Sequence, residues 1–260
     1  MEPSSVPSVF QGGITVVIPT RDEASTLAPV LREWWERRPS GVPYELLVVD
    51  DASADRTPEI LRELSSEIPF RVVRNPSSLG FGGSLRVGIR HASTDWVTFT
   101  DADGQYDPRD LPKLMDALTA GSDLATGWRA PRADPFHRIA ISVGFRGLLY
   151  AFFDLRSRDP TTSLKAGRTD SVRTIADSVR YMNGSFWNEF MIRWTRAGHS
   201  YSEVTIRHRP RKDGKSKVAG GGLLLQVSVQ QLIALLRTWR EFHRSPGIES
   251  PSPEPVPSKP

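Results

Sequence analysis

The chain has 260 residues, 38% of them hydrophobic, and its 34 basic and 30 acidic side chains give a net charge of +4. This length and hydrophobic content suffice for one large core, or for one domain with an appended segment. The sequence contains no cysteine, which excludes disulfides, a thiolate nucleophile and a cysteine-based zinc site.

The two ends of the chain are polar and rich in proline and serine. Residues 1–12 carry neither the basic start nor the apolar run of a signal peptide, and we expect a flexible N-terminus. Residues 244–260 are expected to be a disordered tail, because six of the sixteen residues from Ser245 to Pro260 are proline and four are serine. A single domain is therefore predicted over residues 13–243.

No segment is predicted to span a membrane. The longest uncharged run lies between Lys217 and Arg237, and its three glycines and three glutamines make it a poor bilayer span. The absence of cysteine is compatible with a cytoplasmic protein, which is the localisation that we expect.

Short apolar runs alternate with amphipathic segments through about residue 127. The runs predicted to be strands lie at residues 14–18, 46–49, 70–73, 96–100 and 124–126. The predicted helices lie at residues 25–37, 80–91 and 108–118, and a further one begins at Thr57 with Pro58 at its first position. This alternation predicts an α/β fold with an open, mostly parallel sheet flanked by helices.

The alternation fades after residue 128, where basic and aromatic residues become frequent. Residues 129–158 are predicted to be partly helical, and a late strand is predicted at residues 204–208. Residues 207–217 form a basic loop, with six Lys or Arg against the single Asp213. The amphipathic segment 223–242 predicts a helix with an apolar stripe at Leu225, Val229, Leu232, Leu236 and Trp239. This helix would pack on the core or, because the basic loop precedes it, lie at a membrane surface.

Polar residues follow three of the predicted strands at the point where each strand ends. They are PTRDE at residues 19–23, DDAS at residues 50–53 and DAD at residues 101–103. Open α/β sheets bind ligands beyond the carboxyl ends of their strands. The convergence of these segments therefore predicts a ligand site at that edge of the sheet.

Asp101 and Asp103 are candidate metal ligands. Two carboxylates one residue apart at a strand end can both turn toward one cation, and Gln105 could add a neutral oxygen. Mg²⁺ and Mn²⁺ prefer oxygen ligands and keep open positions for diphosphate oxygens. Such a metal would neutralise a leaving nucleoside diphosphate. The alternative is a solvated acidic turn.

Asp50 and Asp51 follow the second predicted strand. A carboxylate there can accept a hydrogen bond from a base or a ribose hydroxyl. Alternatively, Asp51 and Ser53 cap the next helix and Asp55 interacts with its dipole.

The third strand leads to a glycine-rich turn, Leu79-Gly80-Phe81-Gly82-Gly83-Ser84. Glycines at a helix start expose backbone amides, which suits a phosphate. The turn fits neither the P-loop nor the dinucleotide pattern, so a plain strand-to-helix turn is an equal alternative.

Together these segments resemble the inverting nucleotide-sugar transferases of glycosyltransferase family 2, which have the Rossmann-like GT-A fold. The resemblance covers about residues 12–130 and rests on PTRDEASTL, LLVVDDASADRT, NPSSLGFGGSLRVGI and VTFTDADGQYDPRDLPKL, in that order. It implies a Mg²⁺ or Mn²⁺ site made by Asp101, Asp103 and Gln105. It implies a nucleotide pocket lined by Pro19, Arg21, Glu23 and Asp51, to which we add as candidates Asp50, Ser53, Gly80, Asp101 and Ala102.

Three later segments narrow the resemblance to the dolichyl- or polyprenyl-phosphate sugar transferases. They are GWR at residues 127–129, RDPTT at residues 158–162 and HRPRKDGKSK at residues 208–217. The resemblance implies a UDP- or GDP-sugar donor, bound by residues 13–128, and a lipid-phosphate acceptor on the side of residues 129–243. After Asp-Pro-Thr that subgroup usually continues Ser-Gly-Phe-Arg-Ala, whereas this chain has Thr162-Ser163-Leu164-Lys165-Ala166. Lysine is a point charge and not a bidentate fork.

The second half of the chain is rich in cations, as a phosphate acceptor requires: Arg129, Arg138, Arg146, Lys165, Arg209, Arg211, Lys215 and Lys217. A phosphate brings its own anionic nucleophile at pH 7, so it needs positioning and charge neutralisation but no general base. The residues predicted to take part in catalysis are Asp103, Asp159, Arg129, Lys165 and Arg211. We expect peripheral contact with the cytoplasmic face of a membrane, and no binding of nucleic acid.

Other functions stay open. A sugar or natural-product hydroxyl as acceptor would need a carboxylate base, either Asp159 or Glu189. Glu189 lies among aromatic residues and could instead be only a partner in an ion pair. The cations of residues 207–217 could form a solvated face or bind an RNA backbone. The chain could also bind a nucleotide sugar without turnover, although binding alone has less need of a metal.

Overall fold

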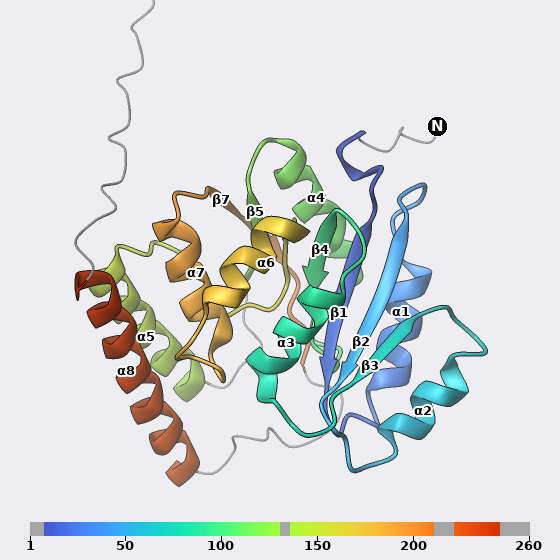
Figure 1. Ribbon diagram of the computed structural model, residues 1–260, viewed down its shortest axis with the longest axis horizontal. Helices are drawn as coiled ribbons and strands as arrows, with labels where there is room; N and C mark the ends of the chain where they lie inside the picture. Colours follow the sequence, from blue (N-terminus) through green and yellow to red (C-terminus); the bar gives the residue numbers. More distant parts are fainter. Residues whose placement is uncertain (1–7, 131–135, 211–220, 245–260) are drawn as a thin grey trace, which may run out of the picture.

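The structure, a computed structural model, describes residues 8–130, 136–210 and 221–244. Its centre is a seven-stranded sheet with the order β3-β2-β1-β4-β6-β5-β7 (Figure 1). The strands are β1 (Ile14–Thr20), β2 (Tyr44–Asp50), β3 (Arg71–Arg74), β4 (Trp96–Phe99), β5 (Leu124–Arg129), β6 (Lys165–Arg168) and β7 (Tyr201–Ile206). All neighbours pair in parallel except β6, which is antiparallel to β4 and to β5. The predicted α/β fold with an open, mostly parallel sheet is therefore confirmed.

Helices cover both faces of the sheet (Figure 1). One face carries α1 (Leu27–Glu36), α2 (Thr57–Leu64) and α4 (Leu111–Thr119), which follows the short 3₁₀ helix η2 (Pro108–Asp110); η1 (Ser8–Phe10) precedes β1. The other face carries α3 (Gly80–His91), α6 (Thr169–Ser178), α7 (Phe186–Arg196), α5 (Phe136–Phe153) and α8 (Gly221–Arg244).

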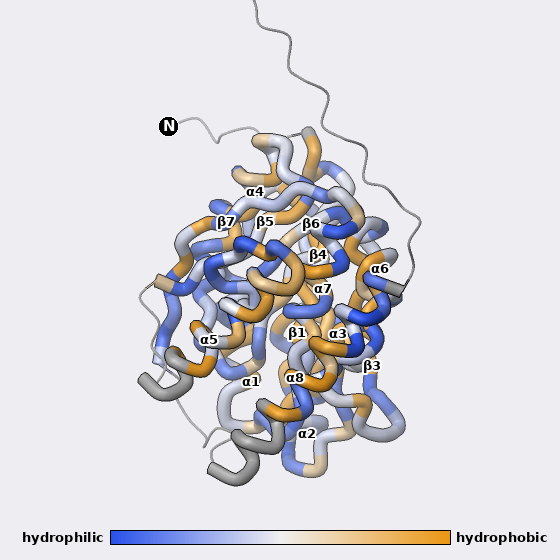
Figure 2. Tube along the Cα trace, turned by 90° about the vertical axis from the view of Figure 1, so that its left-hand side faces the viewer, coloured by the Kyte–Doolittle hydropathy of each residue, from blue (hydrophilic) through white to orange (hydrophobic). Residues whose placement is uncertain are grey.

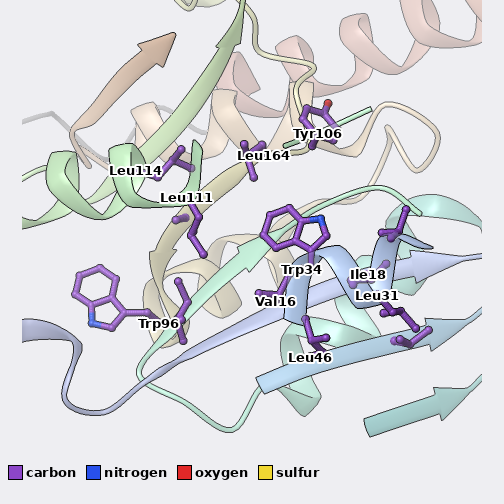
Figure 3. Close-up of a cluster of buried hydrophobic side chains, with 14 of the residues drawn as sticks. Val16, Ile18, Leu31, Trp34, Leu46, Trp96, Tyr106, Leu111, Leu114 and Leu164 are labelled. Carbon is purple, nitrogen blue, oxygen red and sulfur yellow. The ribbon is translucent and has the colours of Figure 1, made fainter. Parts of the chain in front are cut away.

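Strand β1 shows why the central strands are apolar throughout. Val16 and Ile18 pack with Trp34 in the core beneath α1 and α2 (Figure 3). Val17 points the other way and packs in the core beneath α3. Because successive side chains alternate between faces, a strand buried on both sides needs an unbroken apolar run.

The sequence pattern identified the strands that are buried on both faces, but it missed β6. The four residues of β6, KAGR, show neither alternation nor an apolar run. They form a strand because they lie between β4 and β5 and hydrogen-bond to both. Strand β7 also begins at Tyr201, earlier than the predicted residue 204. The helices α6 and α7 were likewise not predicted.

Helices α5 and α8 form a parallel pair at one side of the molecule. Phe152 and Phe153, at the end of α5, meet Trp239 and Phe242, in the last turns of α8, with ring centroids 6.0 and 6.4 Å apart. Both helices therefore begin at the same end of the molecule. Figure 1 shows that β1 and β2 end there as well.

The apolar stripe predicted for α8 packs on the core only in part. Val229 and Leu232 are 49% and 42% exposed, whereas Ala234, Leu235 and Thr238 are buried. The reason is that α8 meets the domain through its second half, where Arg193 of α7 donates to both carboxylate oxygens of Glu241, at 3.3 and 2.9 Å. Within the described ranges, no helix is both long enough and apolar enough to span a membrane.

Candidate active site

The segments that follow β1 and β2 interlock at the carboxyl edge of the sheet. The backbone N–H of Asp22 donates to Ser53 Oγ at 3.0 Å, and the N–H of Ala54 donates back to Asp22 Oδ1 at 2.8 Å. Glu23 N–H donates to Thr57 Oγ1 at 3.1 Å. Asp22 and Ala52 adopt φ angles of 51° and 56°, a left-handed conformation that the reciprocal hydrogen bonds hold in place. The two predicted segments therefore act as one surface.

Asp51 accepts four hydrogen bonds and holds the start of α3. Its Oδ1 accepts from Asn75 Nδ2 and Leu79 N, each at 2.8 Å, and its Oδ2 accepts from Ser78 Oγ at 2.7 Å and Gly80 N at 3.0 Å. Burial acts to raise the pKa of this carboxyl, but these hydrogen bonds outweigh it and lower the pKa. Asp51 is thus a cap, as the alternative had it, but for α3 and not for α2.

Asp50 and Ser53 are buried and hydrogen-bond within the same interlocked loops after β1 and β2. Asp50 is 1% exposed, accepts from Ser53 N–H at 3.0 Å and pairs with Arg74 at 3.0 Å. It borders a separate hollow between α2 and β3 with a volume of about 350 Å³. Since successive residues of a strand point to opposite faces, Asp50 and Asp51 serve different surfaces. Only Asp51 faces the glycine-rich turn.

Residues 101–106, which we call the aspartate loop, follow β4. Asp101, Asp103 and Gln105 are half-buried, whereas Ala102 is buried in the core. Asp103 Oδ1 accepts from Gln105 N at 3.1 Å, and Asp103 lines a cavity of about 80 Å³ together with Glu33 and Thr26 of the α1 side. In the described part of the chain, no three His, Cys, Asp or Glu side chains gather as a metal site.

Tyr106 connects the aspartate loop to two other segments. Its hydroxyl accepts a hydrogen bond from Ser163 N–H at 3.0 Å, and its backbone forms an antiparallel bridge with His208. The side chain is only 3% exposed. Its burial raises the pKa of the phenol to about 12, so the hydroxyl is neutral at physiological pH. The aspartate loop, the turn around Ser163 and the chain that follows β7 are therefore fixed to one another.

Arg209 follows β7 and is engaged by two carboxylates. Its guanidinium donates to both oxygens of Glu33 at 2.7 and 2.8 Å and lies 2.8 Å from Asp107. The hydrogen bonds from Arg209 lower the pKa of Glu33. Its backbone N–H donates to Gln105 O at 2.9 Å, and Gln105 Nε2 donates to Arg209 O at 3.2 Å. Arg209 thus holds the aspartate loop from the side of α1, a role not predicted from its place in the basic loop.

Arg129 and Asp159 form a two-fold ion pair at the end of β5. Arg129 Nε and Nη2 donate to the two carboxylate oxygens of Asp159 at 2.6 and 2.8 Å. The side chains are 10% and 2% exposed. Thr161 Oγ1 accepts from Arg129 at 2.7 Å, and Glu203 of β7 accepts from Arg158 N–H at 2.7 Å. Residues 159–163, which we call the Asp159 turn, are therefore held beside the end of β5.

Two further residues from the sequence analysis are fully buried. Lys165 lies beneath the Asp159 turn and donates to backbone carbonyls. Glu189 accepts from the N–H groups of Arg180, Tyr181 and Met182 and pairs with Arg193 at 2.7 Å. The ion-pair alternative for Glu189 is confirmed, and the structure does not place it as a base.

The sheet edge gathers most of the predicted site residues. Pro19 is the penultimate residue of β1, Arg21 donates to Ser78 Oγ at 2.6 Å, and Gly80 opens α3 with a φ of 73°. Glu23 accepts from its neighbour Thr26 at 3.0 Å. Arg211, Lys215 and Lys217 lie outside the described residues.

Sequence reasoning missed Asn75, Tyr106 and Glu203, which hold these loops from behind. Asn75 comes immediately after the third predicted strand, and Tyr106 comes immediately after DADGQ. Their positions next to predicted site segments could have identified them. For Glu203, a single carboxylate within a strand, the sequence offers none.

Residues 15–179 match the family described as Glycosyl transferase family 2. The match covers more than half of the chain and includes the loops after β1 and β2, the aspartate loop and the Asp159 turn, but not the chain that follows β7. The chain belongs to this family. The predicted resemblance to it is confirmed.

Relatives in the family include enzymes named for polyprenyl phosphates. The dolichol-phosphate mannosyltransferase of Pyrococcus furiosus is 38% identical over 136 residues, which are 50% of this chain but only 38% of that protein. The undecaprenyl-phosphate mannosyltransferase of Micrococcus luteus is 30% identical over 219 residues, 80% of this chain and 88% of that protein. The predicted likeness to this subgroup is confirmed.

A solved structure of similar fold contains a metal and a nucleotide. It is the glucosyl-3-phosphoglycerate synthase of Mycobacterium tuberculosis in complex with Mn²⁺, UDP and glucosyl-3-phosphoglycerate. The TM-score is 0.68 at 22% identity, and the match covers 87% of this chain and 79% of that one. At this identity the likeness shows the fold alone, and it confirms the predicted GT-A fold.

The geometry of Asp51 predicts a pH-dependent loss of stability in Asp51→Ala. Removing an acceptor of four hydrogen bonds, one buried and three partly buried, should lower the free energy of unfolding at pH 7 by about 1–3 kcal/mol. A carboxyl with a lowered pKa stabilises the fold above its unfolded pKa of about 3.9, and that contribution is lost as the pH falls further. Urea titrations should therefore show a deficit that is full at pH 7 and shrinks below about pH 4.

The matched control is Asp116→Ala, which removes an exposed aspartate of α4. It should change the free energy of unfolding by no more than about 0.5 kcal/mol, both at pH 7 and at about pH 3. A deficit in Asp51→Ala that is equal at pH 7 and pH 3, or absent, would contradict the role of Asp51 as a charged cap.

Proposed function

We propose that this chain is an inverting, metal-dependent glycosyltransferase that moves a sugar from a UDP- or GDP-sugar to a polyprenyl phosphate. The observation that carries the proposal is the joining of the aspartate loop to the Asp159 turn through Tyr106. That contact links the loop that carries Asp101 and Asp103 to the turn whose Asp159 binds Arg129, which supports one site for a donor diphosphate and an anionic acceptor. The names of the relatives from Pyrococcus furiosus and Micrococcus luteus support the lipid phosphate.

The donor nucleotide would lie over the interlocked loops after β1 and β2. Arg21 has a side chain that is 52% exposed, so its charge can reach an anionic ligand. Asp51 fixes Ser78 and the first turn of α3 beside it. In this arrangement Asp51 organises the nucleotide pocket, while Pro19, Arg21 and Glu23 line it.

A Mg²⁺ or Mn²⁺ would be held by Asp101 and Asp103, with the amide oxygen of Gln105 as a third ligand. The donor set fits a hard cation, because two half-buried carboxylates follow one strand. Gln105 engages Arg209 O through its nitrogen, and its oxygen is the atom that could reach a cation. The metal would supply neutralisation of the leaving diphosphate.

The acceptor side favours a phosphate over a hydroxyl. A hydroxyl acceptor would need Asp159 as a base, but Asp159 is 2% exposed and both its oxygens accept from Arg129. A phosphate needs no base and instead needs cations. Arg129 is proposed to meet this phosphate, and Arg211, outside the described residues, is proposed as a second cation for it.

The transfer itself is the test. With a labelled UDP- or GDP-sugar, Mn²⁺ and a short polyprenyl phosphate in detergent, the wild type should form the sugar-linked lipid phosphate. Asp103→Asn should reduce the rate by roughly 100-fold or more, since even groups behind the ligands of a metal cost about 10- to 100-fold when lost. Asp116→Asn, exposed on α4, should keep the wild-type rate.

Two results would contradict this function. One is transfer that persists in EDTA or in Asp103→Asn, which would show that the reaction does not need the metal. The other is transfer to a sugar hydroxyl but not to the lipid phosphate, accompanied by inactivity of Asp159→Asn, which would restore Asp159 as a base.

We further propose that exposed apolar side chains of α5 and α8, up to the middle of α8, contact an anionic bilayer. Ile141 and Val143 of α5, and Val229, Leu232 and Ile233 of α8, are 42–49% exposed. Figure 2 views the molecule from this side, with α5 and α8 in front. The two helices begin at the end where β1 and β2 finish (Figure 1). In the sequence, α8 also follows the basic segment 207–217. An apolar helix face that follows a basic segment suits the interface of an anionic membrane.

Leu232→Asp should weaken binding to vesicles of anionic lipid by roughly tenfold, because burying a leucine contributes about 1.5–3 kcal/mol. Sedimentation of the protein with the vesicles measures this. Val72→Asp is the matched control, since Val72 is 45% exposed but lies on β3 at the opposite side of the molecule (Figure 1). Equal binding by both variants would contradict the membrane contact, as would a wild type that buries this face by self-association.

A further inference from the structure

Lys165 is the first residue of β6 and has no exposed surface. Its Nζ donates to Thr162 O at 2.6 Å and to Pro160 O at 3.2 Å. The amino group also lies 5.1 Å from the centre of the Trp187 ring. The side chain is thus enclosed between α7 and the underside of the Asp159 turn, and it cannot reach a ligand without moving that turn.

A buried lysine is costly for the fold, so its presence needs a reason. Burial lowers the pKa of Lys165 to about 7, against the charges of Asp159, Glu203 and Asp101, which raise it. Arg129 acts in the same direction as burial. An apolar side chain of the same length would avoid this cost but would leave the two carbonyl groups without their donor.

Besides the ion pair with Arg129, three side chains hold the Asp159 turn, and Lys165 holds it from beneath. Tyr106 accepts from Ser163 N–H on the side of the aspartate loop. Glu203 accepts from the N–H groups of Arg158 and Asp159, at 2.7 and 3.4 Å, on the side of β7. Lys165 binds the carbonyl groups of Pro160 and Thr162, in the same turn as Asp159, which carries the ion pair with Arg129.

We propose that Lys165 is a positioning residue that fixes the Asp159 turn, and through it Arg129, without touching the acceptor. The inference rests on the proposed function, because the acceptor is the ligand that Arg129 would meet. It replaces the expectation of a direct contact between Lys165 and the acceptor phosphate. A cation that contacts the phosphate and one that holds the turn predict different responses to the loss of its charge.

The test uses the full chain and Lys165→Met, which keeps the length of the side chain but removes its donors and charge. In the absence of any ligand, amide hydrogen exchange over residues 159–163 should become at least several-fold faster. The kcat/KM for polyprenyl phosphate should fall by roughly 10- to 100-fold, since small misplacements near the reacting atoms have such effects. The affinity for nucleoside diphosphate with Mn²⁺ should change less than twofold.

The salt dependence of the KM for polyprenyl phosphate separates positioning from contact. It should be the same in Lys165→Met and in the wild type, because the charge of Lys165 is not presented to the acceptor. A flatter salt dependence in the variant would mean direct contact and would overturn the proposal. Unchanged hydrogen exchange in the Asp159 turn would overturn it as well.

Two controls complete the design. Lys113→Met removes another lysine that donates to a backbone carbonyl, Thr205 O, but far along the chain from the Asp159 turn, and it should leave both measurements unchanged. Lys165→Gln keeps a donor without the charge and should lie between the wild type and Lys165→Met; it also serves if Lys165→Met does not fold. If Lys165→Gln shows the same activity and the same hydrogen exchange as Lys165→Met, the role of Lys165 as a hydrogen-bond donor is contradicted.

The environment of Lys165 can be checked without activity. The chain has six lysines, Lys113, Lys165, Lys212, Lys215, Lys217 and Lys259, so the side-chain Cε signals can be resolved by NMR. One signal should titrate near pH 7 and vanish in Lys165→Met. If the wild type transfers sugar to no lipid phosphate, the proposed function fails, while hydrogen exchange still decides whether Lys165 fixes the turn.

Discussion

The position of Tyr106 constrains the whole candidate site. Its ring is buried in the core beneath α1 and α4, while its hydroxyl accepts from Ser163 N–H and its backbone pairs with His208. Parallel strands bring the aspartate loop and the loops after β1 and β2 to one edge, and the Asp159 turn reaches the same edge because it precedes β6, which runs antiparallel beside β4. The hydrogen bond between Ser163 and Tyr106 ties this turn directly to the aspartate loop. Donor and acceptor groups can then keep a fixed separation, which is the condition for transfer between two bound substrates.

The arginines at this edge of the sheet are already paired with carboxylates. Arg129 is bound to Asp159, and Arg209 to Glu33 and Asp107. Burial opposes the ionisation of Asp107, but the hydrogen bonds from Arg109 and Arg209 outweigh it and lower the pKa of that carboxyl. These pairs build the loops and do not form an open basic patch. An arginine already held by a carboxylate is well oriented and needs little ordering when an anion arrives.

The sequence predicted the part of the site that depends on local order. Apolar runs ending in PTRDE, DDAS and DAD identify strands and the edge where they meet, because parallel strands leave no other arrangement. It could not predict which way each carboxylate turns. Asp50 and Asp51 are adjacent in the chain, yet one pairs with Arg74 and the other caps α3. The sequence also could not predict that Lys165 is buried. Its burial depends on β6, which forms a strand only because β4 and β5 pair with it, so the sequence alone suggested a cation that binds a ligand.

We propose that this edge of the sheet is a metal-assisted donor site. The most direct measurement is a crystal structure of the chain with Mn²⁺ and a nucleoside diphosphate, with the metal located by its anomalous scattering. We expect one Mn²⁺ at about 2.1 Å from oxygens of Asp101 or Asp103 and from the diphosphate, as hard divalent ions require. A nucleotide bound at this edge with no metal near the aspartate loop, or one bound in the hollow between α2 and β3, would contradict the account.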